Sequence, residues 1–236
     1  MNIITTGDTH GKFHLLNNRT MKTINRGDFP DIVAIMGDAG YIFLDDPEER
    51  YWHKWLNEKP WITCATIGNH ENYNRIYKLP LVDFYGGKAY KVSDKVYYLK
   101  HGEIYIFGDV TVLNFGGADS IDKAYRTPYK TWWPEEIPTQ EDYRNAIKNL
   151  SKVSNKVDYV WSHTAPTKFI QILTSADLLP FGGIKLQDPT VSFLDAIESQ
   201  ITYKRWLFGH FHVDFPTFPR ASDSFRALYE LPFLLS

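Results

Sequence analysis

Five short polar segments, each directly after an apolar run of strand length, constrain the fold of this 236-residue chain more than any other feature. The segments are Gly7-Asp8-Thr9-His10, Gly37-Asp38-Ala39-Gly40, Gly68-Asn69-His70-Glu71, Ser162-His163 and Gly209-His210-Phe211-His212. We call them polar turns 1 to 5. Ligands in α/β proteins gather beyond the carboxyl ends of parallel strands. We therefore expect the five polar turns to converge in space.

The first half of the chain alternates strand-like and helix-like patterns. Strands are expected at 3–6, 31–36 and 61–67, with helical spacing over 13–24 and in the segment that begins at Asp46-Pro47. This alternation favours parallel pairing of the strands.

The second half is predicted to be mixed. Short strands, which look antiparallel, are expected at 88–92, 96–100, 103–107 and 110–115, followed by strands at 157–161 and 204–208. A capping-box pattern at Thr139 and Asp142 predicts a helix to about residue 150, and a second helix is expected at 190–200.

The domain organisation follows from the absence of internal repeats and low-complexity linkers. We expect one domain over residues 1–236. Residues 116–138 are rich in turn formers and aromatics without periodicity, and they are expected to form an inserted lid or binding loop.

Charge and cysteine content exclude some classes of protein. The 26 basic and 28 acidic residues leave a net charge of -2, so no global basic field favours non-specific nucleic-acid binding. The single cysteine, Cys64, cannot form an internal disulfide, and it is expected to be a buried, inert thiol in a reducing compartment. No signal-peptide pattern or membrane-length apolar run is present, so a cytoplasmic protein without membrane association is expected.

The side chains of the polar turns are typical metal ligands. Seven candidates are Asp8, His10, Asp38, Asn69, His163, His210 and His212. This number exceeds the needs of one tetrahedral ion and suits two divalent ions about 3.5–4 Å apart. Imidazole, carboxylate and amide oxygen together suit Mn, Fe, Ni or Zn, and Mn is the first choice.

A dinuclear centre of this kind predicts hydrolysis of phosphate esters. Two carboxylates do not cancel the charge of two divalent ions, so the centre would attract an anionic phosphoryl group and activate bound water. His70 follows the ligand Asn69 and is the candidate general acid for the leaving oxygen. His14, His53 and His101 lie outside the polar turns and are expected to be structural or surface residues.

The ordered pattern Asp-x-His, Gly-Asp-x-Gly, Gly-Asn-His-Glu, His and Gly-His-x-His, from Asp8 to His212, resembles the calcineurin-like metallophosphoesterase superfamily, including small bacterial and phage phosphoesterases. The resemblance implies an α/β fold, a four-layer αββα sandwich of two mixed β-sheets flanked by helices. It also implies that one ion is held by Asp8, His10, Asp38 and His212, and that the other is held by Asp38, Asn69, His163 and His210.

The chain departs from one branch of that superfamily. Protein serine/threonine phosphatases carry an Asp-Arg pair after the second motif, whereas residues 41–45 here contain no arginine. Glu71 resembles the protein phosphatases, but the complete Gly-His-x-His motif favours the broader branch that includes phosphodiesterases.

Residues 116–138 supply further candidates for substrate contact. Arg126 is the candidate phosphate clamp, since its planar fork matches phosphate oxygens, and Asn69 is expected to contact substrate as well as metal. Trp132 and Trp133 either pack this loop against the rest of the protein or stack on an aromatic group of the substrate.

The predicted function is therefore that of a metal-dependent phosphoric ester hydrolase that uses in-line attack by a metal-bridging hydroxide. A phosphomonoesterase is the first choice, acting on a phosphorylated small molecule, a nucleotide or a phosphoprotein. The alternative is a phosphodiesterase or nuclease acting on cyclic nucleotides or nucleic-acid ends. A non-catalytic binding scaffold is the remote alternative, because such scaffolds usually lose metal ligands and none is missing here.

Overall fold

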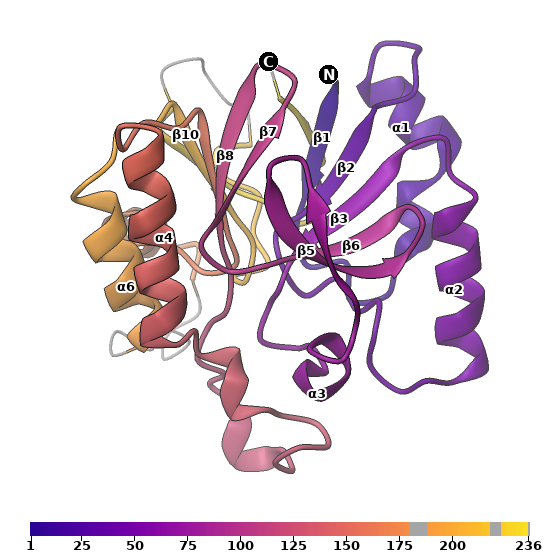
Figure 1. The fold of residues 1–236 in the computed structure, drawn as a ribbon, viewed down its shortest axis with the longest axis horizontal. Coiled ribbons are helices and arrows are strands. Elements are labelled where there is room, and N and C mark those ends of the chain that lie inside the picture. The colour runs from indigo at the N-terminus through magenta and orange to yellow at the C-terminus, as the bar shows by residue number, and fades with distance from the viewer. Residues whose placement is uncertain (180–187, 218–222, 236) are drawn as a thin grey trace.

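Two β-sheets form the centre of the molecule (Figure 1). The computed structural model describes residues 1–179, 188–217 and 223–235. In spatial order, the seven-stranded sheet comprises β12 (Phe233–Leu234), β1 (Ile3–Thr6), β2 (Ile32–Ile35), β3 (Ile62–Thr66), β6 (Val96–Leu99), β5 (Gly87–Ser93) and β4 (Leu81–Phe84). The five-stranded sheet comprises β11 (Phe225–Ala227), β10 (Arg205–Phe208), β9 (Tyr159–Ser162), β8 (Val110–Phe115) and β7 (Glu103–Phe107).

Helices cover the outer face of each sheet (Figure 1). The helices α1 (Asn18–Ile24), α2 (Pro47–Asn57) and α3 (Tyr73–Ile76) lie on the side of the seven-stranded sheet, and α4 (Gln140–Lys152), α5 (Thr167–Ser175) and α6 (Pro189–Glu198) lie on the other side. Three short 3-10 turns are η1 (Phe13–Leu16), η2 (Lys123–Tyr125) and η3 (Pro134–Glu136).

Within the described residues, three hydrophobic cores separate the four layers, and central strands contribute side chains to two of them. In β2, Val33 and Ile35 pack toward the helices, whereas Ile32 and Ala34 pack into the core between the sheets. In β10, Trp206 packs toward α5 while Leu207 joins the core between the sheets. Because strand side chains alternate faces, a strand buried on both sides reads as a continuous apolar run. The predicted four-layer αββα sandwich is confirmed.

The strands of the middle segment were expected to be antiparallel, and this is only half correct. Strand β5 is antiparallel to β6, and β7 is antiparallel to β8. However, β6 pairs in parallel with β3, and β8 pairs in parallel with β9. The chain crosses from one sheet to the other between β6 and β7, so a local turn signal could not reveal which strands pair.

Helix ends follow their capping residues. The segment 13–24, expected as one helical stretch, is divided at Asn17, whose side chain accepts a hydrogen bond from the Thr20 amide and starts α1. Asp46 caps α2, and Thr139 with Asp142 forms the predicted capping box of α4. Each such cap stabilises a helix by about 1 kcal/mol.

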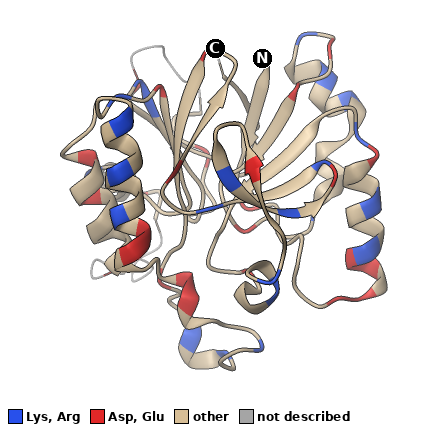
Figure 2. Cartoon of the chain, viewed as in Figure 1, with Lys and Arg blue, Asp and Glu red and all other residues tan. Residues whose placement is uncertain are grey.

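Charged residues lie mainly on the outer helices and loops (Figure 2). Acidic residues fill the first turns of α2 and α4 and a lysine lies in each last turn, the arrangement that complements the helix dipole. Cys64 is fully buried between the sheets, and burial raises the pKa of its thiol. Within the described residues, no helix is both long enough and apolar enough to cross a membrane.

Candidate metal centre

The five polar turns follow β1, β2, β3, β9 and β10, and hydrogen bonds link them to one another. The amide of Asp8 donates to the Gly37 carbonyl at 3.2 Å, and that of His10 donates to the Asp38 carbonyl at 2.8 Å. The amide of Gly209 donates to the His163 carbonyl at 3.0 Å. Polar turns 1 and 2 are thereby tied together, as are polar turns 4 and 5, at one edge of the sandwich.

Three of the polar turns contain residues with strained backbone conformations. Asp8, His10, Asp38, His210 and His212 all have positive φ, between 43° and 68°. A residue other than glycine held in this left-handed region costs on the order of 1–3 kcal/mol and persists only where the surroundings impose it. Five candidate ligands share this conformation, so the surrounding fold holds these turns in a strained backbone conformation that directs the ligand side chains.

The glycines of the polar turns allow neighbouring turns to approach. A Cβ placed on Gly37 would lie 2.0 Å from the His163 ring, and one on Gly68 would lie 2.1 Å from Asp38 Oδ1. A Cβ on Gly209 would lie 2.4 Å from Asp8 Oδ2. Each of these three glycines lies against a candidate ligand from another polar turn. The site therefore requires glycine at these positions, because any side chain would overlap a candidate ligand.

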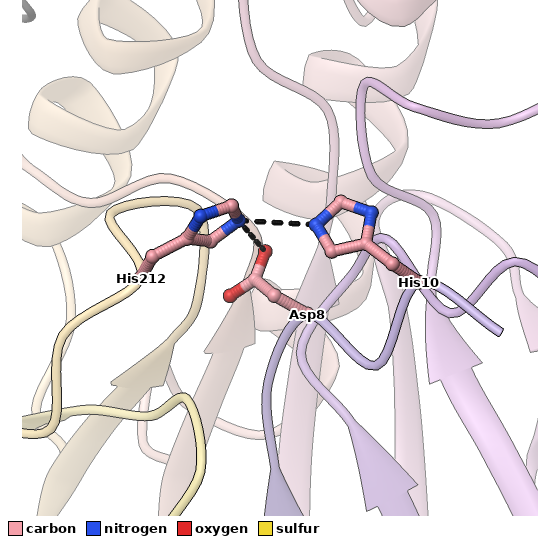
Figure 3. Close-up of side chains that lie close together, drawn as sticks. All are labelled: Asp8, His10 and His212. Atoms are coloured by element: carbon pink, nitrogen blue, oxygen red, sulfur yellow. Dashed lines mark hydrogen bonds and ion pairs between the residues drawn. The ribbon is translucent and has the colours of Figure 1, made fainter. Parts of the chain in front are cut away.

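The first group of candidate ligands comprises Asp8, His10 and His212 (Figure 3). The Nε2 atoms of His10 and His212 lie 3.0 Å apart, and His212 Nε2 lies 3.9 Å from Asp8 Oδ1. One ligand atom from each residue falls within 4.8 Å of the others. Asp8 is fixed beneath the two rings because its carboxylate accepts the His210 amide at 2.8 and 3.0 Å.

The second group comprises Asn69, His163 and His210. Asn69 Oδ1 lies 2.7 Å from His163 Nε2 and 3.1 Å from His210 Nδ1. The other ring nitrogen of His163, Nδ1, lies 2.9 Å from the Met36 carbonyl, which can only accept a hydrogen bond. Nδ1 therefore carries the proton, and Nε2 is the atom available to a cation.

Asp38 lies between the two groups. Its Oδ1 is 3.4 Å from His163 Nε2, and its Oδ2 is 3.8 Å from His10 Nε2. The His70 amide donates to Oδ1 at 2.8 Å and holds the carboxylate in place. One oxygen thus faces each group, so Asp38 would lie between two cations bound by these groups.

The ionisation of the cluster fits divalent cations. Burial lowers the pKa of His10 to about 4 and of His210 to about 3, so both imidazoles are neutral and can offer a lone pair. Burial opposes a charge on His163, but Asp38 and Asp8 raise its pKa to about 9, so without a cation its Nε2 also carries a proton, which a bound metal ion would displace. Asp8 and Asp38 are only 3% and 2% exposed. Burial raises the pKa of Asp8 well above its usual value, so the ionised form of this carboxyl needs positive charge beside it, and metal ions would supply it.

Glu71, the last residue of polar turn 3, supports polar turn 2. Its carboxylate accepts hydrogen bonds from the Ala39 amide at 2.8 Å and from the Tyr98 hydroxyl at 2.6 Å. Burial and the charge of Asp38 raise the pKa of Glu71 to about 8, and those hydrogen bonds oppose the shift. Glu71 is therefore a structural support for the Asp38 turn.

His70 and Arg126 meet at the rim of the centre. Arg126 Nη2 lies 2.6 and 2.8 Å from the two ring nitrogens of His70, and 2.7 Å from Asp122 Oδ2. Burial lowers the pKa of His70, Asp38 opposes the shift, and the guanidinium adds to it. A guanidinium only donates and a neutral imidazole has one acceptor nitrogen, so Arg126 can donate to only one of the two ring nitrogens of His70.

The remaining aromatic candidates pack within the protein. Trp133 is 2% exposed and packs edge-on against Phe43 at 5.7 Å between ring centroids. Trp132 is half-buried, with the Lys123 ammonium 5.5 Å from its ring centroid. The histidines outside the polar turns are distributed as follows: His14 is exposed, His53 contacts the Tyr41 carbonyl, and buried His101 accepts the Gly116 amide.

Two clefts meet at His70. One, of about 550 Å³, is lined by His10 and His70 together with Lys12, His14, Phe43 and Trp52. The other, of about 290 Å³, is lined by Asp38, Asn69, His70, Asp122, His210 and His212. The candidate ligands thus open onto two separate spaces that a substrate can enter.

Sequence reasoning missed two residues that reach the centre from the segment 116–138. Ser120 accepts a hydrogen bond from Asn69 Nδ2 at 2.8 Å, and Glu136 accepts the Ser120 hydroxyl at 2.6 Å. Neither residue has a local pattern that sets it apart, because serine and glutamate are common in loops. Only the folded proximity to Asn69 identifies them.

Comparisons with known proteins identify the family of the chain. The sequence model described as calcineurin-like phosphoesterase matches residues 1–214. No curated protein matches the chain. Among solved structures, the chain is similar to a phosphopantetheinyl hydrolase from Mycobacterium tuberculosis, with 14% identity, coverage of 97% of this chain and 89% of that one, and a TM-score of 0.43. A likeness this distant carries no argument about substrate.

Proposed function

The chain belongs to the calcineurin-like phosphoesterase family, and from that premise we propose that it is a dinuclear phosphomonoesterase, with manganese as its metal. Membership of this family makes it a metal-dependent phosphoester hydrolase. The finer proposal concerns the ligand sets, the general acid and the class of ester.

The observation that carries the proposal is the position of Asp38 between two ligand groups. Its two carboxylate oxygens face His10 on one side and His163 on the other. We assign Asp8, His10, Asp38 and His212 to one ion, and Asp38, Asn69, His163 and His210 to the other. When bound, the two divalent ions supply a hydroxide nucleophile at neutral pH and neutralise charge on the phosphoryl oxygens.

His70 is assigned as the general acid. Its ring lies at the junction of the two clefts, where a leaving oxygen would lie. In the structure Arg126 donates to the neutral ring of His70. A phosphate oxygen is a stronger acceptor for Arg126, so substrate would draw the guanidinium away and leave His70 free to hold and donate a proton.

Positive side chains near the centre favour a monoester. A phosphomonoester carries one more negative charge than a diester, and Arg126 and Lys12 offer cations near the phosphoryl position. The substrate class is accordingly a phosphorylated small molecule or nucleotide, or a phosphoprotein that presents its phosphate at the cleft.

A phosphodiesterase is the second candidate, and the two clefts favour it. A diester has two organic substituents, and clefts of about 550 and 290 Å³ on either side of His70 would receive one each. A nucleic-acid end or a cyclic nucleotide belongs to this class.

Paired chromogenic substrates test the choice. Metal-stripped protein is resupplied with Mn²⁺, Ni²⁺ or Zn²⁺ and assayed with p-nitrophenyl phosphate and with bis-p-nitrophenyl phosphate. The phosphatase proposal expects the higher kcat/KM for the monoester, and it expects Arg126→Ala to lower the monoester value about tenfold more than the diester value. A preference for the diester, with equal effects of the substitution, would replace the first candidate by the second.

The general-acid role of His70 predicts a dependence on the leaving group. His70→Ala should lower kcat about 10²–10³-fold for a phenyl phosphate, whose leaving oxygen needs a proton. The loss for p-nitrophenyl phosphate should be much smaller, because that phenolate leaves unprotonated. The measurement is kcat over a series of substituted phenyl phosphates. A uniform loss across the series would rule out the acid role. His53→Ala serves as the control histidine, because His53 contacts the Tyr41 carbonyl and lines neither cleft.

A further inference from the structure

The amide of Asn69 has two faces with opposite surroundings. Its Oδ1 lies 2.7 Å from His163 Nε2 and 3.1 Å from His210 Nδ1, within the second ligand group. Its Nδ2 points away from that group and donates to Ser120 Oγ at 2.8 Å. Asn69 is 3% exposed, so the amide is oriented by protein atoms.

Ser120 is in turn held by Glu136. The Ser120 amide donates to Glu136 Oε1 at 2.8 Å, and the Ser120 hydroxyl donates to Oε2 at 2.6 Å. Ser120 is 1% exposed and Glu136 is 0% exposed. A carboxylate only accepts hydrogen bonds, so the hydroxyl proton of Ser120 points at Glu136.

The direction of these hydrogen bonds fixes the amide of Asn69. With its proton directed at Glu136, Ser120 Oγ presents a lone pair to Asn69. Only the NH₂ group of the amide can donate to that lone pair. The oxygen of the amide must then face His163 and His210, and oxygen is the amide atom that a divalent cation binds.

We infer that Ser120 and Glu136 are positioning residues that set the polarity of the Asn69 amide and present its oxygen to the second metal ion. The inference rests on the proposed function, because it takes Asn69 as a metal ligand. It adds two residues outside the ligand set, and it links residues 116–138 to the metal centre.

The backbone places Ser120 beside polar turn 3. The Gly117 amide donates to the Ile67 carbonyl at 2.8 Å. A Cβ on Gly116 would lie 2.3 Å from that same carbonyl, so only glycine permits the approach. Ser120 and Glu136 lie near the two ends of the segment that also carries Arg126. The two hydrogen bonds between Ser120 and Glu136 close this loop, and the hydrogen bond from Asn69 Nδ2 to Ser120 Oγ orients the proposed metal ligand.

The first variant is Ser120→Ala, which removes the acceptor for Asn69 Nδ2. The amide then loses its orienting partner. Residues that orient a metal ligand typically affect metal affinity 10–100-fold. Metal-free protein is titrated with Mn²⁺ at pH 8 by isothermal titration calorimetry. The Mn²⁺ affinity of the weaker of the two sites should be about 10–100-fold lower than in the parent protein, and the electron paramagnetic resonance spectrum of bound Mn²⁺ should change.

The second variant, Glu136→Gln, keeps the side-chain volume but replaces one acceptor oxygen by an NH₂ donor. The carbonyl of the new amide would accept the Ser120 backbone N–H, and its NH₂ would donate to Ser120 Oγ. The hydroxyl proton would then point at Asn69 and favour a flipped amide with NH₂ toward the metal. The titration should again show a weakened site, by about 10–100-fold. In a Ser120→Ala background, Glu136→Gln should add nothing further to the loss.

The matched control is Ser93→Ala. It removes another serine–asparagine hydrogen bond, from Ser93 Oγ to Asn57 Oδ1 at 3.0 Å, on a strand remote from the polar turns. Its Mn²⁺ affinity should equal that of the parent protein, and metal-free melting temperatures show whether each variant is folded. If parent and both variants bind two Mn²⁺ with affinities within twofold, the positioning role is wrong and the proposed function stands. If the parent binds no Mn²⁺, the proposed function fails and this inference falls with it.

Discussion

Asp38→Asn is expected to abolish most of the hydrolytic activity, with a fall in kcat/KM of about 10³-fold or more. The carboxylate lies between both ligand groups, so one substitution weakens both metal ions. Charge stabilisation by such ions amounts to several kcal/mol, and each 1.36 kcal/mol is a factor of ten in rate. The measurements are kcat/KM for p-nitrophenyl phosphate and the metal content after dialysis, both of which should fall.

The control for Asp38→Asn is Asp158→Asn at the start of β9. The Asp158 carboxylate accepts the Thr111 amide at 2.8 Å and pairs with Lys204, and it belongs to neither ligand group. This variant should keep its metal content and activity. An Asp38→Asn protein with unchanged metal content and turnover would show that the assignment of Asp38 as a shared ligand is wrong.

Gly68→Ala is expected to lower kcat by about 10²-fold, although the glycine itself binds nothing. The new methyl group would lie 2.1 Å from Asp38 Oδ1 and 2.3 Å from the Asp38 backbone nitrogen. Overpacking of this kind costs about 1–3 kcal/mol of stability. Displacing a catalytic group by about 1 Å costs on the order of 10²-fold in rate. Thermal unfolding and kcat, measured with Mn²⁺, should both fall.

Gly27→Ala is the control that separates backbone strain from steric overlap. Gly27 has φ of +107°, but a Cβ there meets nothing within 4 Å. Alanine at this position should lower stability by about 1–2 kcal/mol and leave kcat unchanged. Wild-type kcat in Gly68→Ala would mean that polar turns 2 and 3 can move apart without affecting the chemistry.

Much of the fold was predictable because buried parallel strands have strong local signals. The runs that became β1, β2, β3, β9 and β10 are almost entirely buried on both faces, and each ends at a polar turn. The ligand candidates could be selected because glycine, aspartate and histidine recur at strand ends. The metal-dependent phosphoesterase class follows from the same residues and agrees with the family match.

The remainder depends on contacts between distant segments, which local patterns do not encode. The helix α5 (Thr167–Ser175) was missed, although Phe169 and Leu173 form part of a core, because its N-cap position is a proline without a capping side chain. The parallel pairing of β6 with β3 is likewise a non-local choice between two sheets. Ser120 and Glu136 acquire their role only beside Asn69.

The hydrogen bonds from the His210 amide to Asp8 join residues 202 positions apart. The ribosome must therefore synthesise the chain from Asp8 to His210 before these hydrogen bonds can form. Contacts of such long sequence separation are typical of slowly folding topologies. A nascent chain with only the first three polar turns would hold Asp8 and Asp38 without His163, His210 or His212. Because the proposed ligands come from both ends of this span, we expect the complete metal centre to form only after synthesis has passed residue 212.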